Sequence, residues 1–430
     1  MLRRALFITA SAIGLLAATA DAGAQRAPAT PREHVEIERS PLLFYLAKGE
    51  PNACGPGCSE WIAAEGQFDS GAAERFRHFL KQTSGRTLPI YFYSPGGLTD
   101  NGLAIGRMLH ERGMTAGVAR TIPEGCIGKS EAVCRAMKRS GAPLLARWRG
   151  INAGCNSSCV YALIGAKVRH VPPGARVGIH ASKVPYIGEW ERLFANVQLA
   201  SFNLELRNYI HEMGISDDLY GAIQKVPFEK VHILSRNELA RFRIDTSSFQ
   251  ETPWTVVEAS ATQRASVIKL FTHADGVRPD EFRTSLVRLS CGEPSRINVR
   301  YERELVPDKG APPKPDATTW AAISLAAGPV GLSFPKTSPI SKTELIDAGR
   351  VTDGRTASTS LEFLEVAASH PTIDILETDS AAELGNPPRA IKLSTLGLST
   401  ALGALRKSCG ANPPVGRYVP REHRKPAPRF

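Results

Sequence analysis

The first 250 residues alternate between segments with strand-like and helix-like hydrophobic patterns. Apolar runs rich in β-branched and aromatic residues predict strands at Ser59–Phe68, Thr87–Tyr93, Thr115–Ala119 and Gly174–His180. Apolar residues at helical spacing predict helices at Ala72–Lys81, Asp100–Arg112, Cys159–Gly165 and Glu189–Met213. The last helix is long, and its expected apolar side carries Leu193, Phe194, Val197, Ala200 and Leu204. This alternation predicts an α/β domain over residues 51–250 with a largely parallel sheet.

The pattern changes after the polar, turn-rich stretch Asp245–Trp254, where we expect a domain boundary. Beyond it we expect a helix at Ala259–Thr272, strands at Arg296–Tyr301, Thr319–Leu325 and Ile373–Glu377, and a final helix at Leu396–Lys407. These elements predict a smaller α+β domain over 255–412, in which no residue pattern indicates a particular chemistry. A basic disordered tail is expected over 413–430.

The N-terminus has the pattern of a secretory signal peptide. Arg3 and Arg4 precede an uncharged apolar run, Ala5–Ala20, and small residues follow at possible cleavage positions. The alternative is a retained membrane anchor, but the run is short for a span, and no later segment reaches about 18 apolar residues. We therefore expect a signal peptide over 1–24, a flexible segment over 25–50, and an exported protein, periplasmic or secreted, without a membrane span after cleavage.

The net charge of +11, from 53 basic and 42 acidic residues, raises the question of a nucleic-acid partner. Part of the excess lies in Val415–Phe430, where five Arg and Lys residues stand against one Glu. The rest of the chain has no block of like charge and no basic stretch interleaved with aromatic residues. A solvated basic tail explains this pattern better than a nucleic-acid arm, so we expect no nucleic-acid partner.

An even number of cysteines in an exported protein favours disulfide bonds. Eight cysteines allow 105 connectivities, but the spacing suggests three close pairs and one wide pair, Cys291 with Cys409. The close pairs would come from Cys54, Cys58, Cys126, Cys134, Cys155 and Cys159. No histidine lies at ligand spacing from these cysteines, so we expect no metal, and nothing in the sequence indicates a cofactor.

Three features of the first domain indicate a chemistry when they are taken together. Ser94-Pro95-Gly96-Gly97 ends a buried strand, and glycines there can expose backbone N–H groups to a carbonyl oxygen. Ser157 and Ser158 begin an apolar helix, as an ordinary N-cap or as a nucleophile would. His180 ends an apolar strand, where it can serve as a base or simply occupy the rim of the sheet. Each feature alone is more often structural.

The order of these features resembles the Clp protease proteolytic-subunit/crotonase-like superfamily, and within it an exported bacterial branch with a C-x-S-[AS]-C serine turn. The resemblance covers Ser59–Asp245, including a closing segment, Leu234–Leu239, that is followed by Ile244-Asp245. It implies a layered parallel-sheet core of the crotonase/Clp-protease type in the first domain. The second domain lies outside the resemblance.

Carried over residue by residue, the resemblance implies that Ser157 is the nucleophile, with Ser158 as the alternative. Ser157 is preferred because its distance from Gly165 in the sequence fits the family spacing better. His180 would be the general base, and the backbone N–H groups of Gly97 and Ser158 would bind the oxyanion.

The third catalytic residue is where the sequence departs from the family. The family's acid falls in a register near Val231, where this chain has no Asp. Glu229 is the nearest carboxylate and His232 the nearest polar neighbour, while Asp217 and Asp218 lie farther away. The site is therefore a Ser–His dyad, a triad completed by Glu229, or an inactive remnant.

The leading hypothesis is an exported serine hydrolase, an ATP-independent peptidase that forms an acyl-enzyme on Ser157 and acts on a peptide or protein substrate. The alternative is a non-catalytic periplasmic binding or assembly protein on the same scaffold. Acyl-CoA chemistry is disfavoured because CoA is a cytosolic cofactor. Because Glu189–Met213 corresponds in position to an element through which relatives form rings, the resemblance also implies a possible homo-oligomer.

Overall fold

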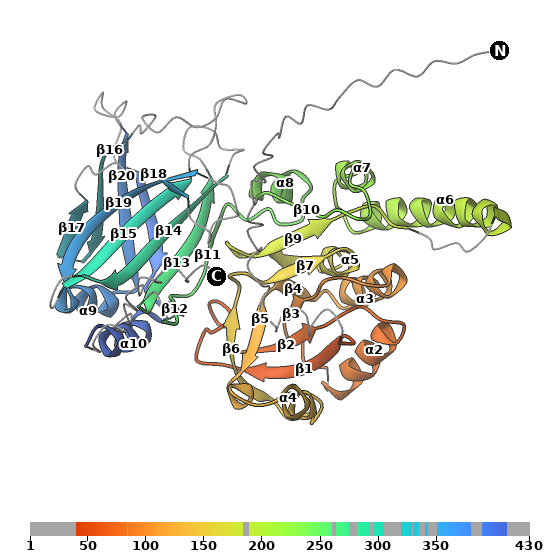
Figure 1. The fold of residues 1–430 in the computed structure, drawn as a ribbon, viewed down its shortest axis with the longest axis horizontal. Helices are drawn as coiled ribbons and strands as arrows, with labels where there is room; N and C mark the ends of the chain where they lie inside the picture. The colour runs from red at the N-terminus through yellow and green to blue at the C-terminus, as the bar shows by residue number, and fades with distance from the viewer. Residues whose placement is uncertain are drawn as a thin grey trace, which may run out of the picture.

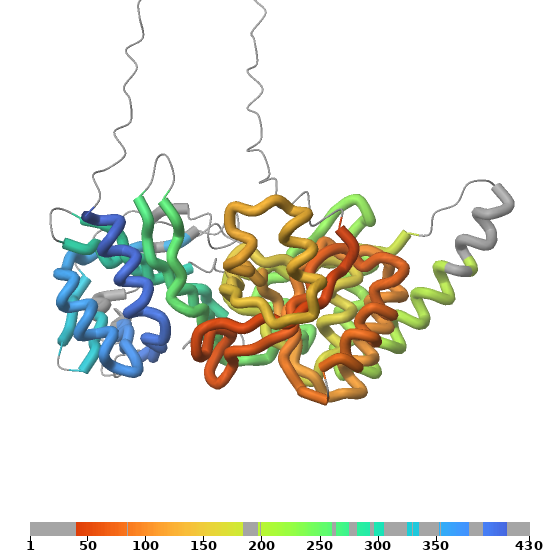
Figure 2. Tube along the Cα trace, turned by 90° about the horizontal axis from the view of Figure 1, so that it is seen from below, coloured from red at the N-terminus to blue at the C-terminus, as the bar shows by residue number. Residues whose placement is uncertain are grey.

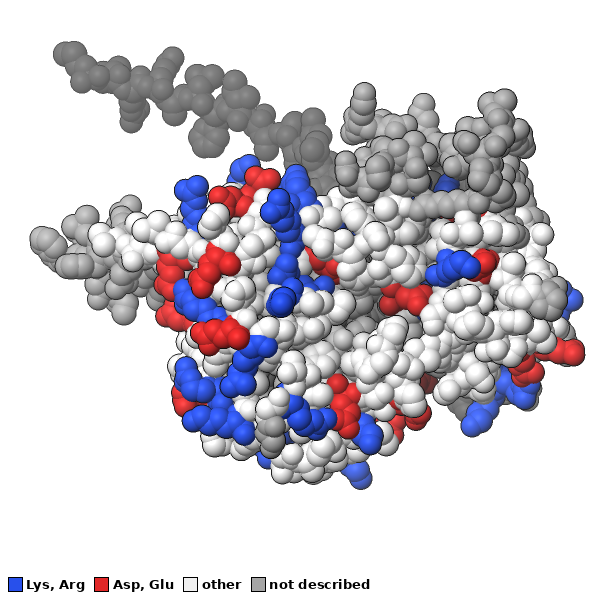
Figure 3. Space-filling view, turned by 180° about the vertical axis from the view of Figure 1, so that it is seen from behind, with Lys and Arg blue, Asp and Glu red and all other residues white. Residues whose placement is uncertain are grey.

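The computed structural model describes residues 40–83, 85–183, 189–259, 264–274, 282–292, 296–304, 320–328, 330–334, 340–342, 351–379 and 389–410. The predicted signal peptide and basic tail lie outside these residues. Among the described helices, none is both long and apolar enough to cross a membrane. On the face shown in Figure 3, basic and acidic side chains are interspersed rather than separated by sign.

The first domain is a mixed α/β structure built on a sheet in the order β5-β6-β1-β2-β3-β4-β8. The strands are β1 (Leu43–Lys48), β2 (Glu60–Glu65), β3 (Ile90–Tyr93), β4 (Thr115–Val118), β5 (Arg120–Pro123), β6 (Leu144–Arg149) and β8 (Val168–His170). From β2 to β8 the neighbouring strands are parallel, whereas β1 runs antiparallel to β2 and β5 antiparallel to β6. Parallel strands therefore form the half of the sheet next to the candidate site.

The first domain's helices are α2 (Ala72–Gln82), α3 (Thr99–Glu111), α4 (Glu131–Lys138), α5 (Ser158–Ile164), α6 (Glu189–Glu212), α7 (Asp218–Lys225) and α8 (Arg236–Arg241). In α2 the buried residues Ala72, Phe76 and Leu80 recur every four positions and form one apolar stripe. Helix α3 packs against α5, and a Cβ at Gly102 would overlap the Ser158 carbonyl of α5. The serine-bearing helix is therefore held directly against the core.

A second, three-stranded sheet carries the candidate site, in the order β10-β9-β7 (Figure 1). Its strands are β7 (Gly154–Asn156), β9 (Arg176–Ile179) and β10 (His232–Ile233). Strands β7 and β9 are parallel, with Asn156 opposite Gly178. Because β7 leads into Ser157 and β9 leads into His180, the parallel pairing brings both segments to the same end of the sheet.

The described residues from Phe249 to Gly410 form two antiparallel sheets with two helices. One sheet has the order β11-β13-β14-β15-β19-β18, with β12 also paired to β13, and the other has the order β17-β16-β20-β21. Helices α9 (Leu361–Ser369) and α10 (Leu398–Gly410) pack on them. The strands of the first sheet are β11 (Phe249–Glu251), β12 (Thr255–Val257), β13 (Ser266–Ala274), β14 (Phe282–Cys291), β15 (Arg296–Glu304), β18 (Ile340–Lys342) and β19 (Val351–Ser360). Those of the second are β16 (Trp320–Ala327), β17 (Val330–Phe334), β20 (Thr372–Asp379) and β21 (Arg389–Ser394).

Two expectations from the sequence are corrected. Residues 25–50 were expected to be flexible, but β1 lies in this range and pairs with β2 and β6 inside the sheet. The helix expected at Ala259–Thr272 is wrong over its C-terminal half, which is part of β13. That strand is buried along nearly its whole length between β12 and β14, and a strand buried on both faces lacks the polar–apolar alternation that distinguishes strands.

The long helix α6 projects from the first domain (Figures 1 and 2). Val197 and Leu204, on the side expected to be apolar, are 68% and 62% exposed. The residues that pack into the core are instead Leu206, Tyr209 and Ile210. Self-association through this helix stays a prediction from the sequence.

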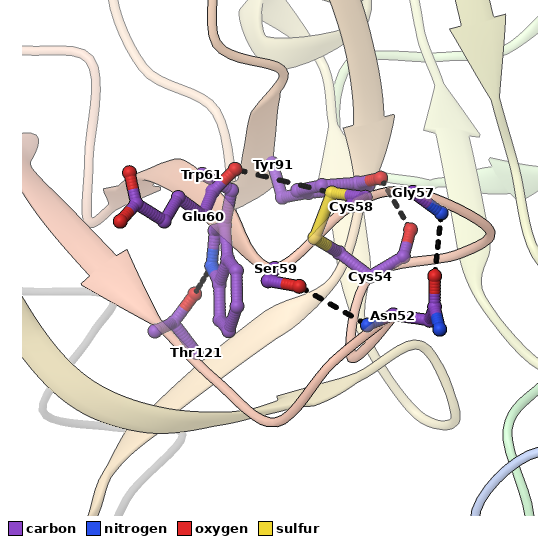
Figure 4. The surroundings of a disulfide bond; sticks show 9 residues. All are labelled: Asn52, Cys54, Gly57, Cys58, Ser59, Glu60, Trp61, Tyr91 and Thr121. Carbon is purple, nitrogen blue, oxygen red and sulfur yellow. Dashed lines mark hydrogen bonds between the residues drawn. A yellow bond between two sulfur atoms is a disulfide. The ribbon is translucent and has the colours of Figure 1, made fainter.

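All eight cysteines are paired, as Cys54–Cys58, Cys126–Cys134, Cys155–Cys159 and Cys291–Cys409. These are the three close pairs and the one wide pair that the spacing suggested. The Cys54–Cys58 loop rests on the sheet, since the Tyr91 hydroxyl donates to the Cys54 carbonyl oxygen at 3.1 Å (Figure 4). Four disulfides in one chain are typical of an oxidising, extracytoplasmic compartment.

The end of the first domain is fastened by the buried carboxylate of Asp245. It accepts hydrogen bonds from Arg236 at 3.2 Å, from the Val171 N–H at 2.8 Å and from the Ser247 N–H at 3.0 Å. Burial raises the pKa of Asp245, but the guanidinium and the two N–H groups outweigh burial and lower the pKa below its usual value. The ionised carboxylate is thus favoured in the folded state.

We predict that Asp245→Asn lowers the free energy of unfolding by about 3–5 kcal/mol at pH 7, because it leaves Arg236 buried without its counter-charge. The folded pKa lies below the unfolded value of about 3.9, so the carboxylate's contribution is complete at neutral pH and is lost as the pH falls through the folded pKa. Urea unfolding at pH 7 and pH 3 should therefore show a smaller difference between wild type and variant at pH 3. Glu258→Gln, at an exposed ion pair with Arg147, should change stability by less than about 1 kcal/mol.

Candidate active site

The serine turn joins β7 directly to α5 through a single residue, Ser157. Its backbone has φ 56° and ψ −126°, a conformation that residues with a Cβ rarely adopt. Such strain costs about 1–3 kcal/mol and persists only where the surroundings impose it. A serine on a strained turn from strand to helix has the local geometry of a nucleophile elbow, which lifts the hydroxyl away from the backbone.

The two serines of the turn differ in their surroundings. Ser157 is half-buried, and its hydroxyl makes no hydrogen bond to any described residue, so it does not act as the helix cap that its position would allow. Ser158 is fully buried, and its hydroxyl also lacks a partner within the described chain. Only Ser157 therefore offers a hydroxyl that a ligand can reach.

Backbone hydrogen bonds from two neighbouring segments hold the serine turn in place. The Ser157 N–H donates to the Gly178 carbonyl of β9 at 2.8 Å, and the Asn156 N–H donates to the Ser94 carbonyl at 3.1 Å. The buried Cys155–Cys159 disulfide links the residues on either side of the turn. The backbone is therefore fixed both before and after Ser157, whose φ and ψ are unusual.

The Ser94-Pro95-Gly96-Gly97 loop follows β3 and lies against the serine turn. A Cβ on Gly96 would stand 2.6 Å from the Ser157 Cβ and 2.7 Å from the Asn156 carbonyl oxygen. A Cβ on Gly97 would overlap the carbonyl oxygen of Phe68, and both glycines have positive φ, 106° and 142°. Glycine is thus required at both positions by close backbone approach and by backbone conformation.

Gly97 is exposed, and its N–H has no acceptor among the described residues, although the neighbouring Leu98 N–H donates to Phe68 at 2.6 Å. An exposed backbone N–H in a loop that packs against the serine turn is the type of donor that an oxyanion hole uses. The Gly97 N–H is therefore open to a substrate, whereas Ser158 is fully buried.

His180 follows β9 directly and is half-buried. Its Nδ1 lies 2.9 Å from the carbonyl oxygen of Ala181, and its ring meets the Phe228 ring edge-on with centroids 5.2 Å apart. The Ala181 N–H in turn donates to the Val226 carbonyl at 2.8 Å. Because a carbonyl can only accept, Nδ1 carries the proton, and the neutral ring then has its lone pair on Nε2.

Ser157 and His180 lie at the ends of paired parallel strands, since Ser157 bonds to Gly178, two residues before the histidine. No hydrogen bond joins their side chains within the described structure. Hydrogen bonds between catalytic groups are often long before a substrate binds.

The carboxylates considered from the sequence have other partners. Glu229 is exposed and lies 3.5 Å from Lys183; its own backbone N–H and the Lys183 ammonium lower its pKa. His232 pairs with Glu238 at 2.8 Å, and Asp217 lies 3.8 Å from His211. Val231, in the register of the family's acid, stands against Gly178 of β9. No carboxylate within the described residues forms a hydrogen bond with His180.

Two features of the site escape sequence reasoning. A backbone carbonyl such as that of Ala181 has no sequence signature, because every residue carries one. The positive φ of Ser157 cannot be predicted from the sequence either, since serine is not a residue that indicates this conformation. Among the described residues, no cluster of His, Cys, Asp and Glu is suited to hold a metal ion.

Comparisons with known proteins assign no family. No family model matches the chain, and no curated protein matches it. Among solved structures it is similar to a ClpP1 mutant from Listeria monocytogenes, with 14% identity and a TM-score of 0.27 over 50% of this chain and 92% of that chain. A TM-score this low assigns neither family nor activity.

We predict that Gly96→Ala lowers the free energy of unfolding by about 2–4 kcal/mol. The added Cβ collides with the serine turn, and the alanine must also adopt a positive φ. Gly214→Ala is the matched control, since Gly214 has φ 68° and nothing within 4 Å of its added Cβ. Strain alone should cost that variant about 1 kcal/mol. Equal losses in urea unfolding would show that the serine turn is not close-packed against Gly96.

Proposed function

We propose that this chain is an exported serine hydrolase that forms an acyl-enzyme on Ser157 and cleaves peptides without ATP. The observation that carries the proposal is the strained strand–serine–helix turn, which has a hydroxyl unbonded within the described chain and lies between the Gly96–Gly97 loop and the strand that leads into His180. The four disulfides support export, because such bonds persist in oxidising compartments.

In the proposed reaction the Ser157 Oγ attacks the substrate carbonyl carbon, and His180 Nε2 takes the hydroxyl proton. The N–H groups of Gly97 and Ser158 stabilise the oxyanion of the tetrahedral intermediate, as single donors worth about 3–4 kcal/mol do elsewhere. The intermediate collapses when the C–N bond breaks and His180 returns the proton to the leaving amine. Water then attacks the acyl-enzyme with the same base and regenerates the serine.

The Ala181 carbonyl takes over one of the two roles that an acid has in such a site. By accepting from Nδ1–H it selects the tautomer with a basic Nε2, and loss of this selection costs about 10⁴ in rate in a serine protease. A neutral carbonyl stabilises the imidazolium less than a carboxylate does, because hydrogen bonds to charged acceptors are stronger. We therefore propose a Ser–His dyad oriented by the main chain, in preference to a triad with Glu229.

The second candidate function is a non-catalytic binding or assembly protein. The valine in the register of the acid and the lack of a Ser157–His180 hydrogen bond favour it. On this alternative the serine turn survives as a structural element only.

We predict that a fluorophosphonate probe labels the wild-type protein and not Ser157→Ala, because the Ser157 hydroxyl is half-buried and unbonded among the described residues, whereas its neighbour Ser158 is fully buried. Ser158→Ala should keep the label, since that hydroxyl is fully buried. The measurement is in-gel fluorescence with intact-mass confirmation of one adduct. A folded wild type that takes up no probe would leave only the binding function. Loss of labelling in Ser158→Ala alone would show that Ser158, and not Ser157, is the nucleophile.

We further predict that Glu229→Gln changes the labelling rate less than about twofold, because Glu229 pairs with Lys183 at the surface and not with His180. His180→Ala should slow labelling by about 10²-fold or more, since general-base assistance is lost. Second-order labelling rates measured between pH 5 and 9 separate the two cases. A Glu229→Gln variant that is labelled as slowly as His180→Ala would favour the triad with Glu229 over the dyad.

A further inference from the structure

The proposed reaction gives no role to the side chain of Asn156, the residue that precedes the nucleophile. The main chain of Asn156 is engaged, since its N–H donates to the Ser94 carbonyl at 3.1 Å. Its side-chain oxygen Oδ1 is buried and has no hydrogen-bond partner in the described part of the chain. The residue as a whole is half-buried, so the NH₂ group is the end of the carboxamide that a ligand can reach.

An unpaired oxygen in this position is unfavourable for the fold. A buried carbonyl oxygen without a donor has lost its hydrogen bonds to water and gained none in return. An apolar side chain of similar size would avoid that penalty. Buried polar groups without a partner in a native protein call for an explanation beyond packing, and a part in the reaction is one such explanation.

The carboxamide of Asn156 lies on the face of the small sheet that also carries the histidine. Asn156 stands opposite Gly178 in the parallel pair of β7 and β9, and a Cβ added to Gly178 would overlap Oδ1 of Asn156. The carboxamide therefore lies over Gly178, where the absence of a side chain leaves room for it. Because residues two apart along an extended strand point to the same face, His180 shares this face with Gly178.

The separation of Asn156 and His180 suits one bridging water molecule. The two residues are diagonal neighbours on adjacent strands, and strands about 4.8 Å apart with a rise of about 3.3 Å per residue place such neighbours about 8 Å apart. No hydrogen bond joins the two side chains within the described structure. The Nδ1–H of His180 is directed to the Ala181 carbonyl at 2.9 Å, which leaves Nε2 as the acceptor for a water molecule.

We infer that Asn156 positions the water molecule that hydrolyses the acyl-enzyme. The inference rests on the proposed function, because it concerns the second half of that reaction. The carboxamide NH₂ group donates to the water oxygen, while the water donates to Nε2 of His180. The water oxygen attacks the acyl carbonyl carbon and its proton passes to Nε2. The bond between the acyl carbon and the Ser157 Oγ then breaks, the proton passes from Nε2 to Oγ, and the carboxylic acid leaves.

The test separates acylation from deacylation in the full-length protein, with p-nitrophenyl acetate as an activated ester. Asn156→Ala should release nitrophenolate in the first turnover within about twofold of the wild-type rate, because acylation uses no water. Its steady-state rate should be at least about tenfold lower, since the attacking water is no longer held in place. Intact-mass measurement should show one acetyl group accumulating on the variant, and none once Ser157→Ala is added. Fluorophosphonate labelling, which also needs no water, should be unchanged within about twofold.

Two further variants serve as controls. Asn156→Leu keeps the approximate size of the side chain and removes its polar atoms, so it should show the same separation of the two rates. Its urea midpoint should not fall below that of the wild type, because no hydrogen bond within the described structure is lost. Asn208→Ala, at an exposed asparagine of α6, should match the wild type in both rates.

A steady-state rate unchanged in both Asn156 variants would overturn the inference. A parallel loss of the first-turnover and steady-state rates would also overturn it, because a purely structural role affects both. A wild type that takes up fluorophosphonate while its Asn156 variants turn over normally would leave the hydrolase proposal standing and remove only this inference. A folded wild type that reacts with neither the ester nor the probe would remove both.

Discussion

The close contact between the Gly96 backbone and the Ser157 turn is the constraint on which the rest of the site depends. With a Cβ at position 96 the loop would have to move away from the serine, and Gly97 would move with it. On the other side, a Cβ at Gly178 would meet the side chains of Asn156 and Val231. The strained serine is therefore clamped between two backbones that approach as closely as glycine permits.

This clamp has an energetic consequence. The conformation of Ser157 costs about 1–3 kcal/mol, a sizeable share of a domain stability of about 5–15 kcal/mol. A fold retains such a cost where many independent contacts impose it, and here they come from β3, β9 and the Cys155–Cys159 disulfide. An ordinary serine N-cap would have its hydroxyl bonded to the helix and its backbone in the β region, and Ser157 has neither.

Much of the fold could be predicted from hydrophobic periodicity, and the exceptions have physical causes. Helix α2 and the strands at residues 90–93 and 176–179 are present as expected, because their apolar periods are determined locally. Strand β13 was mistaken for a helix because burial on both faces erases alternation. The apolar stripe of α6 did not decide between core packing and self-association, because such a stripe specifies a contact surface but not what covers it.

The site could be predicted in its parts and not in its connections. The residue types of Ser157, His180 and Gly97 suggested their roles, but their approach depends on strand pairings that only the fold supplies. The orienting group of the histidine was sought among carboxylates, whereas the structure offers the Ala181 carbonyl. Search by residue type cannot find a main-chain acceptor.

The main-chain acceptor also bears on how the site would respond to its surroundings. A carboxylate partner would couple the imidazolium to a second charge, whereas a carbonyl adds none. The loop that presents the carbonyl is tied down by the hydrogen bond from the Ala181 N–H to the Val226 carbonyl, and the serine turn by the hydrogen bond from the Ser157 N–H to the Gly178 carbonyl. Both members of the proposed dyad are thus held by main-chain hydrogen bonds of the fold rather than by a third charged side chain.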